Sequence, residues 1–276
     1  MSGIASRLSS VLNKDSGRAV VVAFDHGTDG AVRGGEDAER MLTMLAASDA
    51  EGILLAPGLA THYAPDPTVR VPSLLVGIDL PIFGARPATG EPLTTVRDVT
   101  TPVDALRLGA VMCKMLLPLG WEDHREWGDA IERIALRAAE CDALGVPLMV
   151  EPAFWGTDAR KSDDEIVHAA RVAVELGAHV LKVPATEDPA RLAEIVEWSP
   201  VPVYVLGGDP EDSASFARRV VSWVDSGATG VVVGRNVWNR RNPAAAVDAL
   251  REAVHGRDVA AATALLEQAG EPLGSL

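Results

Sequence analysis

The sequence is poor in lysine, in cysteine and in aromatic residues, and the shortage of lysine is the most informative. Only four of its 25 basic residues are lysines, against 39 acidic residues, and the formal net charge is −14. A chain of this charge repels nucleic-acid phosphates and anionic membrane surfaces unless it carries a basic patch, and the sequence contains none. We therefore expect neither nucleic acid nor a membrane as a partner. Any lysine inside an apolar strand becomes conspicuous.

Two cysteines, Cys113 and Cys141, are too few and too isolated for a disulfide framework or a zinc cluster. They are expected to be small buried thiols. The opening segment MSGIASRLSSVLNKDSG lacks the continuous apolar core of a secretion signal. No apolar run reaches the roughly 18 residues of a membrane span. These absences predict a cytoplasmic protein.

Short apolar runs of strand length alternate with charged stretches of helical spacing, a pattern typical of parallel βα units. The runs are apolar on both faces, which fits strands covered by helices. The eight candidate strands are Ala19–Phe24, Gly52–Ala56, Ser73–Ile78, Ala110–Met115, Pro147–Glu151, His179–Val183, Val203–Leu206 and Gly230–Val233. The pattern predicts an α/β fold, a single (βα)8 TIM barrel that occupies residues 1–276 as one domain.

The segments between these strands have helical spacing and carry start and stop signals. The expected helices are Glu36–Ala47, Glu122–Leu144, Ser162–Leu176, Pro189–Glu197, Asp212–Ser226 and Pro243–Val254, with an extra N-terminal helix Ile4–Leu12 and a C-terminal helical segment Asp258–Ala269. The start signals are a capping box from Ser162 to Glu165 and the pairs Asp188-Pro189 and Asn242-Pro243, and the stop signals are Gly145, Gly177, Gly227 and Gly256. The stretch Pro57–Val103 is the weakest, because proline and glycine are dense there and the boundaries of the second and third βα units are poorly defined.

The active site of such a barrel lies at the C-terminal ends of its strands, so the residues near those ends are the candidates for chemistry. Here they are unusually polar. They comprise Asp25 and His26 after the first strand, Lys114 in the fourth, Glu151 at the end of the fifth, Lys182 in the sixth, Gly207 and Gly208 after the seventh, and Gly234 and Arg235 after the eighth.

Lys182 lies between Leu181 and Val183 in an apolar strand, and only the barrel lumen offers partners to its amine. Burial and the positive charge of Lys114 favour the neutral amine, the form that attacks a carbonyl to give a Schiff base. Glu151, on the neighbouring strand, could move protons during such a reaction. The alternatives are a simple buried ion pair between Lys182 and Glu151, or a lysine that extends to solvent.

Two further residues have competing interpretations. Asp25 could accept a hydrogen bond from a substrate hydroxyl or orient Lys182, or it could only cap the next helix. His26 could act as a base or a metal ligand, and it is also a candidate for substrate binding. A metal site is not expected, because none of the six histidines has ligand spacing such as i, i+4.

The ends of the last two strands predict an anion site. Glycines at 207, 208 and 234 let backbone N–H groups approach a phosphate closely, and Arg235 adds a positive charge with bidentate geometry. In barrels these two loops frequently form a phosphate site. The alternative is that the glycines serve only the turns.

Six segments in this order, VVVAFDHG, AVMCKMLL, LMVEPAFW, GAHVLKVP, VYVLGGD and GATGVVVGRNVW, resemble a known superfamily over residues 19 to 238. It is the class I, Schiff-base aldolase superfamily of archaeal-type fructose-bisphosphate aldolase, tagatose-bisphosphate and sulfofructose-phosphate aldolases and aminodideoxyheptulosonate synthase. The resemblance implies a TIM barrel in which Lys182 forms the imine and Asp25 is the acid of the first strand. Lys114 and Glu151 match residues of the tagatose-bisphosphate branch, and Gly207, Gly208, Gly234 and Arg235 match the phosphate loops.

The sequence departs from the archaeal-type branch at one position. That branch places an acid/base tyrosine just after the fifth strand, whereas this chain reads Glu151-Pro-Ala-Phe-Trp155. Its only tyrosines are Tyr63 and Tyr204. Glu151 is the natural substitute for the tyrosine as acid/base.

The sequence therefore predicts a metal-independent aldolase without a cofactor, which acts on a phosphorylated ketose with dihydroxyacetone phosphate as the three-carbon unit. One alternative is a biosynthetic aldolase that joins dihydroxyacetone phosphate to an amino-acid semialdehyde. Others are a sugar-phosphate isomerase or epimerase and a sugar-phosphate-binding protein without activity. The resemblance also implies a homo-oligomer.

Overall fold

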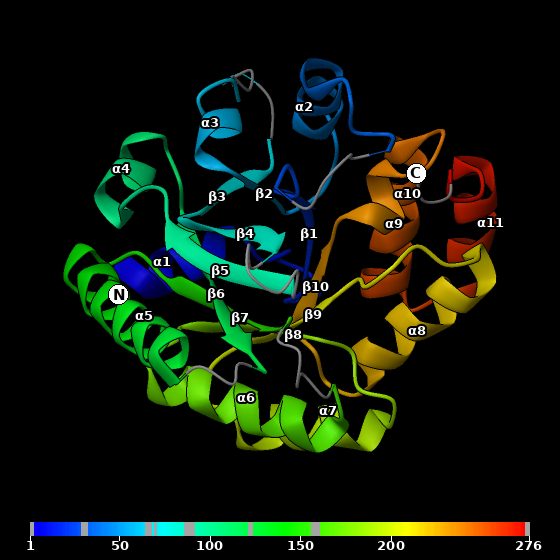
Figure 1. Cartoon of the computed structure of the whole chain (residues 1–276). Coiled ribbons are helices and arrows are strands. Elements are labelled where there is room, and N and C mark those ends of the chain that lie inside the picture. The colour runs from blue at the N-terminus through cyan, green and yellow to red at the C-terminus, as the bar shows by residue number, and fades with distance from the viewer. Residues whose placement is uncertain are drawn as a thin grey trace.

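The computed structural model describes residues 3–28, 33–63, 68, 71–85, 92–120, 124–155 and 161–273. Within these residues, parallel strands close into a barrel in the order β1-β10-β9-β8-β7-β6-β3-β2 (Figure 1). They are β1 (Ala19–Phe24), β2 (Gly52–Leu55), β3 (Ser73–Gly77), β6 (Met112–Leu119), β7 (Leu148–Phe154), β8 (Val180–Val183), β9 (Val203–Leu206) and β10 (Gly230–Val233). The predicted TIM barrel and its eight strands are confirmed.

Helices surround the barrel (Figure 1). They are α1 (Gly3–Ser10), α2 (Ala38–Ala46), α3 (Pro57–Ala60), α4 (Pro102–Arg107), α5 (His124–Leu144), α6 (Asp163–Glu175), α7 (Pro189–Trp198), α8 (Ser213–Asp225), α9 (Arg235–Trp238), α10 (Pro243–Arg251), the π-helix η1 (Glu252–Gly256) and α11 (Val259–Ala269). The expected helices at the two ends of the chain are confirmed as α1 and α11. No described helix combines the length and the apolar character needed to cross a membrane.

Most of the predicted helix signals are confirmed. Ser162 and Glu165 form a capping box, and Asp188 and Asn242 cap α7 and α10 through their side chains. The glycines at 145, 177 and 227 have φ angles of 66°, 94° and 96°. The helix ends at Gly256 as predicted, but Gly256 is the last residue of η1 and the left-handed residue that follows is Arg257. A Cβ at Gly256 would lie 2.2 Å from the Glu252 carboxylate, so this glycine makes room for a side chain.

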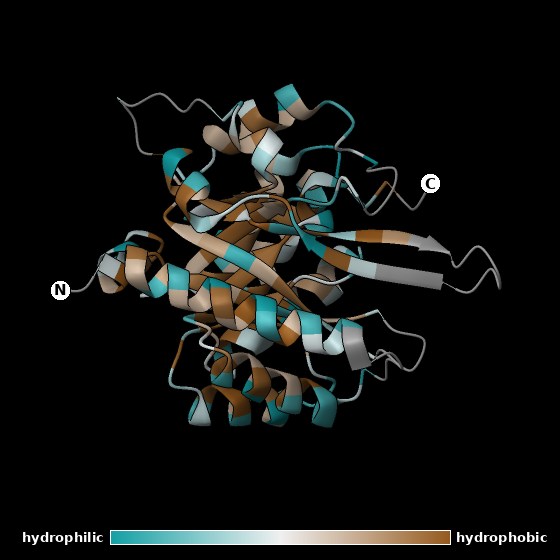
Figure 2. Ribbon diagram, turned by 60° about the vertical axis from the view of Figure 1, so that its left-hand side comes forward, coloured by the Kyte–Doolittle hydropathy of each residue, from teal (hydrophilic) through white to brown (hydrophobic). Residues whose placement is uncertain are grey.

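An antiparallel hairpin lies outside the barrel, in the stretch that the sequence left undivided. Its strands are β4 (Asp79–Ala85) and β5 (Pro92–Asp98), and Asp79 pairs with Asp98 at its base. The hairpin crosses in front of the strands in Figure 1 and projects from one end of the barrel in Figure 2. Because β3 is the strand that precedes it, the hairpin extends from the end of the barrel that carries the C-terminal strand ends.

Charged side chains attach the base of the hairpin to the barrel. The buried carboxylate of Asp79 accepts hydrogen bonds from the Leu116 N–H at 3.0 Å and from Arg133 at 2.8 Å. Asp98 accepts from Arg133 at 2.8 Å and from Arg137 at 2.9 Å. Burial raises the pKa of Asp79 to about 6, although Arg133 opposes this. Two arginines of α5 therefore hold both strands of the hairpin at its base.

The strands β6 and β7 are longer than predicted. The sequence analysis predicted that these strands end at Met115 and Glu151, but their pairing with each other continues to Leu119 and Phe154. The extension packs against the hairpin, where Val96, Leu116 and Ala153 form a small buried cluster. Contacts with an element that the sequence did not predict therefore extend these two strands.

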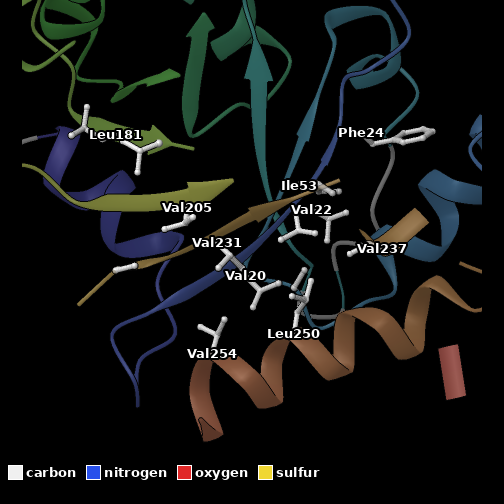
Figure 3. Close-up of a cluster of buried hydrophobic side chains, with 14 of the residues drawn as sticks. Val20, Val22, Phe24, Ile53, Leu181, Val205, Val231, Val237, Leu250 and Val254 are labelled. Atoms are coloured by element: carbon white, nitrogen blue, oxygen red, sulfur yellow. The ribbon is translucent and has the colours of Figure 1, made fainter. Parts of the chain in front are cut away.

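Alternate residues of each strand face the lumen and the helices. The lumen core includes Val21, Ala23, Leu54, Leu75, Met112, Met149, Val180, Tyr204 and Val232, and Val11 packs against it. Figure 3 shows part of the outer layer, in which Val20 and Val231 pack with Leu250 and Val254. The same alternation determines which polar residues near the C-terminal ends of the strands point into the lumen.

The two cysteines lie in the outer layer. Cys113 on β6 and Cys141 on α5 are both free and fully buried. The contact with Cys141, together with burial, raises the pKa of the Cys113 thiol above its usual range. The thiol is therefore held in its unreactive form, as the sequence predicted.

A buried polar cluster joins β2 to the C-terminal helices. The carboxylate of Glu51 accepts hydrogen bonds from the Val20 N–H at 2.9 Å and from Arg251 at 2.5 Å, and it lies 3.2 Å from His255 Nε2. Burial alone would raise the pKa of Glu51, but the hydrogen bonds from His255 and Val20 and the charges of His255 and Arg251 lower it to about 2. The ionised carboxylate therefore stabilises the folded state.

This cluster predicts a pH-dependent loss of stability. The lowered pKa makes a contribution on the order of 3 kcal/mol that is present above the unfolded-state pKa of about 4.3 and is lost as the pH falls toward 2. We expect Glu51→Gln to lower the free energy of unfolding in urea at pH 7 and to flatten its decline between pH 5 and 3. Glu175→Gln, on a side chain that is 62% exposed, serves as the control. Equal effects of the two substitutions would contradict the assignment.

Candidate active site

Four polar side chains continue the lumen face of their strands. Each lies two residues beyond a residue of the lumen core, and side chains two apart in a strand point to the same side. The pairs are Ala23 with Asp25, Met112 with Lys114, Met149 with Glu151, and Val180 with Lys182. Strand periodicity therefore brings these four side chains together above the apolar core of the barrel.

Glu151 lies at the centre of this group. Its Oε2 atom is 2.9 Å from Lys182 Nζ and 2.8 Å from Lys114 Nζ. Lys114 Nζ is also 3.4 Å from Asp25 Oδ2. The two lysine side chains are 5% exposed, Asp25 is 7% exposed and Glu151 is 13% exposed. Two lysines and two carboxylates are thus linked in a single buried chain.

The electrostatic environment keeps three of these groups charged. Burial would raise the pKa of Asp25, but the charges of Lys114, His26 and Lys182 lower it to about 2. Burial acts in the same direction on Glu151, and the charges of Lys114 and Lys182 lower its pKa nonetheless. Burial would lower the pKa of Lys114, but Glu151, Asp25 and Asp79 raise it above its usual range. Lys114 is therefore a permanent cation in this site.

We call the four side chains of Asp25, Lys114, Glu151 and Lys182 the floor of the site. His26 connects this floor to the end of the last strand. Its Nδ1 lies 3.5 Å from Asp25 Oδ1, and its ring meets the edge of the Trp238 ring at 5.5 Å between centroids. A Cβ at Gly234 would lie 2.7 Å from His26 Cε1. The lack of a side chain at Gly234 is thus required for His26 to occupy this position.

The glycine loops after β9 and β10 lie side by side. Gly208 has a φ angle of 68°, and Gly234 precedes the first turn of α9. The Gly207 N–H already donates to Val232 O, so this amide belongs to the sheet. Arg235 Nη1 lies 2.6 Å from Asp209 Oδ1 and joins the two loops. The Arg235 side chain is 43% exposed and the Asp209 side chain is 86% exposed.

Two buried polar residues that the sequence did not single out hold these loops. The amide of Asn236 donates to Gly207 O at 3.2 Å and to Asp209 O at 2.8 Å, and its oxygen accepts from the Glu211 N–H. Arg240 is 2% exposed and donates to Asn236 O, Glu211 O and Gly270 O. Only the position of Asn236, directly after the predicted anion loop, offered a signal in the sequence.

A small pocket opens above the floor. It is lined by Asp25, His26, Lys114, Glu151 and Lys182, and by Leu80, Pro81, Leu116 and Trp155. The sequence predicted the polar residues of this lining and missed the apolar ones, because two of these belong to the hairpin. Such a site offers an amine for attack on a carbonyl and a carboxylate beside it for proton transfer.

Comparisons with known proteins identify the family of this chain. The model of the DeoC/LacD family aldolases matches residues 19–240. The 2-amino-4,5-dihydroxy-6-oxo-7-(phosphonooxy)heptanoate synthase of Streptomyces griseus is 33% identical over 90% of this chain and 89% of its own length. The 2-amino-3,7-dideoxy-D-threo-hept-6-ulosonate synthase of Halobacterium salinarum is 30% identical over 97% of both chains.

A solved structure shares the fold. An archaeal fructose 1,6-bisphosphate aldolase superposes with a TM-score of 0.75 at 24% identity, over 92% of this chain and 99% of that one. The family match covers most of the chain, and the resemblance noted in the sequence is confirmed. The chain belongs to the DeoC/LacD family of class I aldolases and is an enzyme of the lyase type.

Proposed function

We propose that this enzyme forms a Schiff base between Lys182 and a phosphorylated ketose, without a metal or other cofactor, and makes or breaks a carbon–carbon bond with dihydroxyacetone phosphate as the three-carbon unit. One observation carries the proposal. Glu151 Oε2 lies 2.9 Å from Lys182 Nζ and 2.8 Å from Lys114 Nζ, so a carboxylate stands beside the amine and is itself held by a second cation.

In the cleavage direction Glu151 takes a proton from the Lys182 ammonium, and the neutral amine attacks the C2 carbonyl of the ketose phosphate. Glu151 returns this proton to the hydroxyl of the carbinolamine, which leaves as water and gives a protonated imine. Glu151 then removes the proton of the C4 hydroxyl. The C3–C4 bond breaks, its electron pair moves toward the iminium nitrogen to give an enamine, and the aldehyde leaves. Protonation of the enamine at C3 and addition of water to the imine release dihydroxyacetone phosphate and the free amine. Synthesis follows the reverse order.

The neighbours of Glu151 support its role as acid/base. Lys114 fixes the carboxylate at 2.8 Å, and its charge lowers the pKa of Glu151 so that the base form is present at neutral pH. Asp25, 3.4 Å from Lys114, remains ionised and is available to accept a hydrogen bond from a substrate hydroxyl. In this assignment Glu151 does the work of the tyrosine of the archaeal-type branch.

The phosphate of the three-carbon unit is assigned to the loops after β9 and β10. Gly207, Gly208, Gly234 and Arg235 are next to each other, and His26 connects them to the catalytic floor. Because the Gly207 N–H already donates to Val232 O, Gly207 would leave room for the phosphate but would not donate to it. Arg235 would exchange its pairing with Asp209 for the phosphate, with bidentate geometry. The phosphate binds away from the C3–C4 bond that reacts, so its binding energy can be used to orient the substrate at Lys182.

The biosynthetic direction has specific support. Two relatives at 33% and 30% identity carry names of heptanoate and heptulosonate synthases. This favours the joining of dihydroxyacetone phosphate to an amino-acid semialdehyde as the second candidate reaction. We further propose that residues 1–276 act as one aldolase domain, in a cytoplasmic homo-oligomer that binds neither nucleic acid nor a membrane.

The imine predicts a covalent adduct at one lysine. Borohydride reduction in the presence of dihydroxyacetone phosphate is expected to add one reduced three-carbon unit to the peptide that contains Lys182. Lys182→Met should abolish the adduct and lower kcat/KM about 10³-fold or more. The measurement is peptide mass mapping together with an aldol assay in the presence of a chelator. Turnover without any trapped adduct would favour an isomerase or epimerase, and binding without turnover would favour a sensor protein.

If Glu151 is the acid/base of bond cleavage, replacing it should impair cleavage and still allow the imine to form at Lys182. We expect Glu151→Gln to lower kcat about 10²-fold to 10⁴-fold, because proton transfer at the C4 hydroxyl is lost. The borohydride adduct at Lys182 should persist. Adduct yield and turnover are measured on the same preparation. Loss of the adduct with retention of the fold would instead make Glu151 a partner in imine formation alone.

The phosphate assignment predicts an effect on binding alone. Arg235→Ala is expected to raise KM for dihydroxyacetone phosphate about 10-fold to 100-fold, as the loss of a charge-assisted hydrogen bond implies, with little change in kcat. Arg171→Ala, on a helix face where the side chain is 64% exposed, is the control. A purely structural role of the Arg235–Asp209 pair would change thermal stability and leave KM unaltered.

A further inference from the structure

The pocket above Lys182 has two chemically different sides. One side consists of the floor residues Asp25, Lys114, Glu151 and Lys182 together with His26, all from β1, β6, β7 and β8 or the residues that directly follow them. The other side, which we call the apolar wall, consists of Leu80, Pro81, Leu116 and Trp155. Leu80 and Pro81 come from β4 of the hairpin, Leu116 comes from β6, and Trp155 directly follows β7.

The topology places this wall opposite the glycine loops. In the closed ring of strands, β3 lies halfway round from β9, and β6 lies halfway round from β10. The hairpin follows β3 directly, and Leu116 belongs to β6. A ketose phosphate whose phosphate lies at the β9 and β10 loops and whose C2 is bound to Lys182 therefore directs its far end toward the apolar wall. The far end is the part that leaves, or enters, as the aldehyde.

The wall is held in a fixed position. The Trp155 ring meets the Phe83 ring edge to face at 5.4 Å between centroids, so the end of β7 is braced against the hairpin. Leu116 packs with Val96 and Ala153 in a buried cluster to which Trp155 adds. The hydrogen bonds of Asp79 to Arg133 and to the Leu116 N–H fix the base of the hairpin. The apolar wall is thus a fixed part of the pocket.

The described charged side chains near the wall already contact other groups. Among the described residues that line the pocket, the lysine cations are those of Lys114 and Lys182, and both contact Glu151. On the hairpin, Arg97 donates to Val96 O and pairs with Glu126. A phosphate or carboxylate placed directly against the wall would lose its hydration without gaining an ion pair from the side chains that the structure describes there, which is a strongly unfavourable exchange.

We propose that the β4–β5 hairpin determines the specificity of the enzyme for its aldehyde, through Leu80 and Pro81, and selects an unphosphorylated aldehyde whose chain is apolar next to the carbonyl. The inference rests on the proposed function, since it takes Lys182 and the glycine loops as the anchors of the three-carbon unit. It names the class of the second substrate, and it distinguishes this site from one built for an aldehyde phosphate.

The test compares two aldehydes in the direction of synthesis. With dihydroxyacetone phosphate as donor, the wild-type enzyme is expected to use butanal with a kcat/KM at least about 10-fold higher than that for D-glyceraldehyde 3-phosphate. This difference is typical of a charge that loses its water without finding a partner. Unphosphorylated D-glyceraldehyde, which carries hydroxyls but no phosphate, should fall between the two.

Matched arginine substitutions on the same strand locate the effect. Leu80→Arg places a cation on the wall and should shift the ratio of the two kcat/KM values at least about 10-fold toward D-glyceraldehyde 3-phosphate. Ile82→Arg is the control, because Ile82 is 51% exposed and does not line the pocket, and it should leave the ratio unchanged. Leu80→Ser, a smaller change that tests the same position if Leu80→Arg fails to fold, should lower kcat/KM for butanal several-fold with KM for dihydroxyacetone phosphate unaltered.

The outcomes separate this inference from the proposed function. If borohydride traps dihydroxyacetone phosphate at Lys182 but the wild-type enzyme prefers D-glyceraldehyde 3-phosphate, the hairpin inference is wrong and the proposed function stands. The same holds if Leu80→Arg and Ile82→Arg shift the ratio equally. If no adduct forms at Lys182, the proposed function fails, and the inference that depends on it is wrong as well.

Discussion

The site depends on one carboxylate shared by two buried lysines. A lysine in a barrel lumen is unfavourable unless a negative charge lies beside it, and Glu151 provides that charge to Lys114 and Lys182 with a single oxygen, 2.8 Å and 2.9 Å away. Asp25 provides the second negative charge. Two formal positive charges thus face two formal negative ones, so the net charge of −14 arises outside this group. The arrangement lets the barrel bury an amine nucleophile next to a base.

The sequence predicted the parts of the molecule that follow from strand periodicity. The eight barrel strands were readable because each is a short apolar run, and the four floor residues were readable because each interrupts or ends such a run at the lumen side. Lys182 and Lys114 stood out further because the chain has so few lysines. Local chemistry also predicted the helix caps at Ser162, Asp188 and Asn242.

The parts that the sequence did not predict depend on contacts between distant segments. The hairpin lies in a stretch rich in proline and glycine, and its place is set by Arg133 and Arg137 of α5, which bind Asp79 and Asp98 from more than thirty residues away. The longer β6 and β7 follow from the same packing. Arg240 has one nearby partner, the Asn236 carbonyl four residues before it, while its other partners, Glu211 O and Gly270 O, come from distant segments that the local sequence does not indicate. Periodicity finds strands and lumen residues, but it carries no information on such contacts.

The hairpin and the floor are built in different ways. The floor is part of the barrel, so any change there disturbs both the chemistry and the core. The hairpin stands outside the ring of strands, and its anchor is a buried ion pair whose carboxylate, Asp79, has its pKa raised to about 6 by burial. A pair with so large a desolvation cost contributes little net stability, but it fixes geometry, because a displaced Asp79 would be left buried without Arg133. The anchor thus holds Leu80 and Pro81 over Lys182 while the residues of the wall remain free to differ, which separates the choice of aldehyde from the chemistry of the imine.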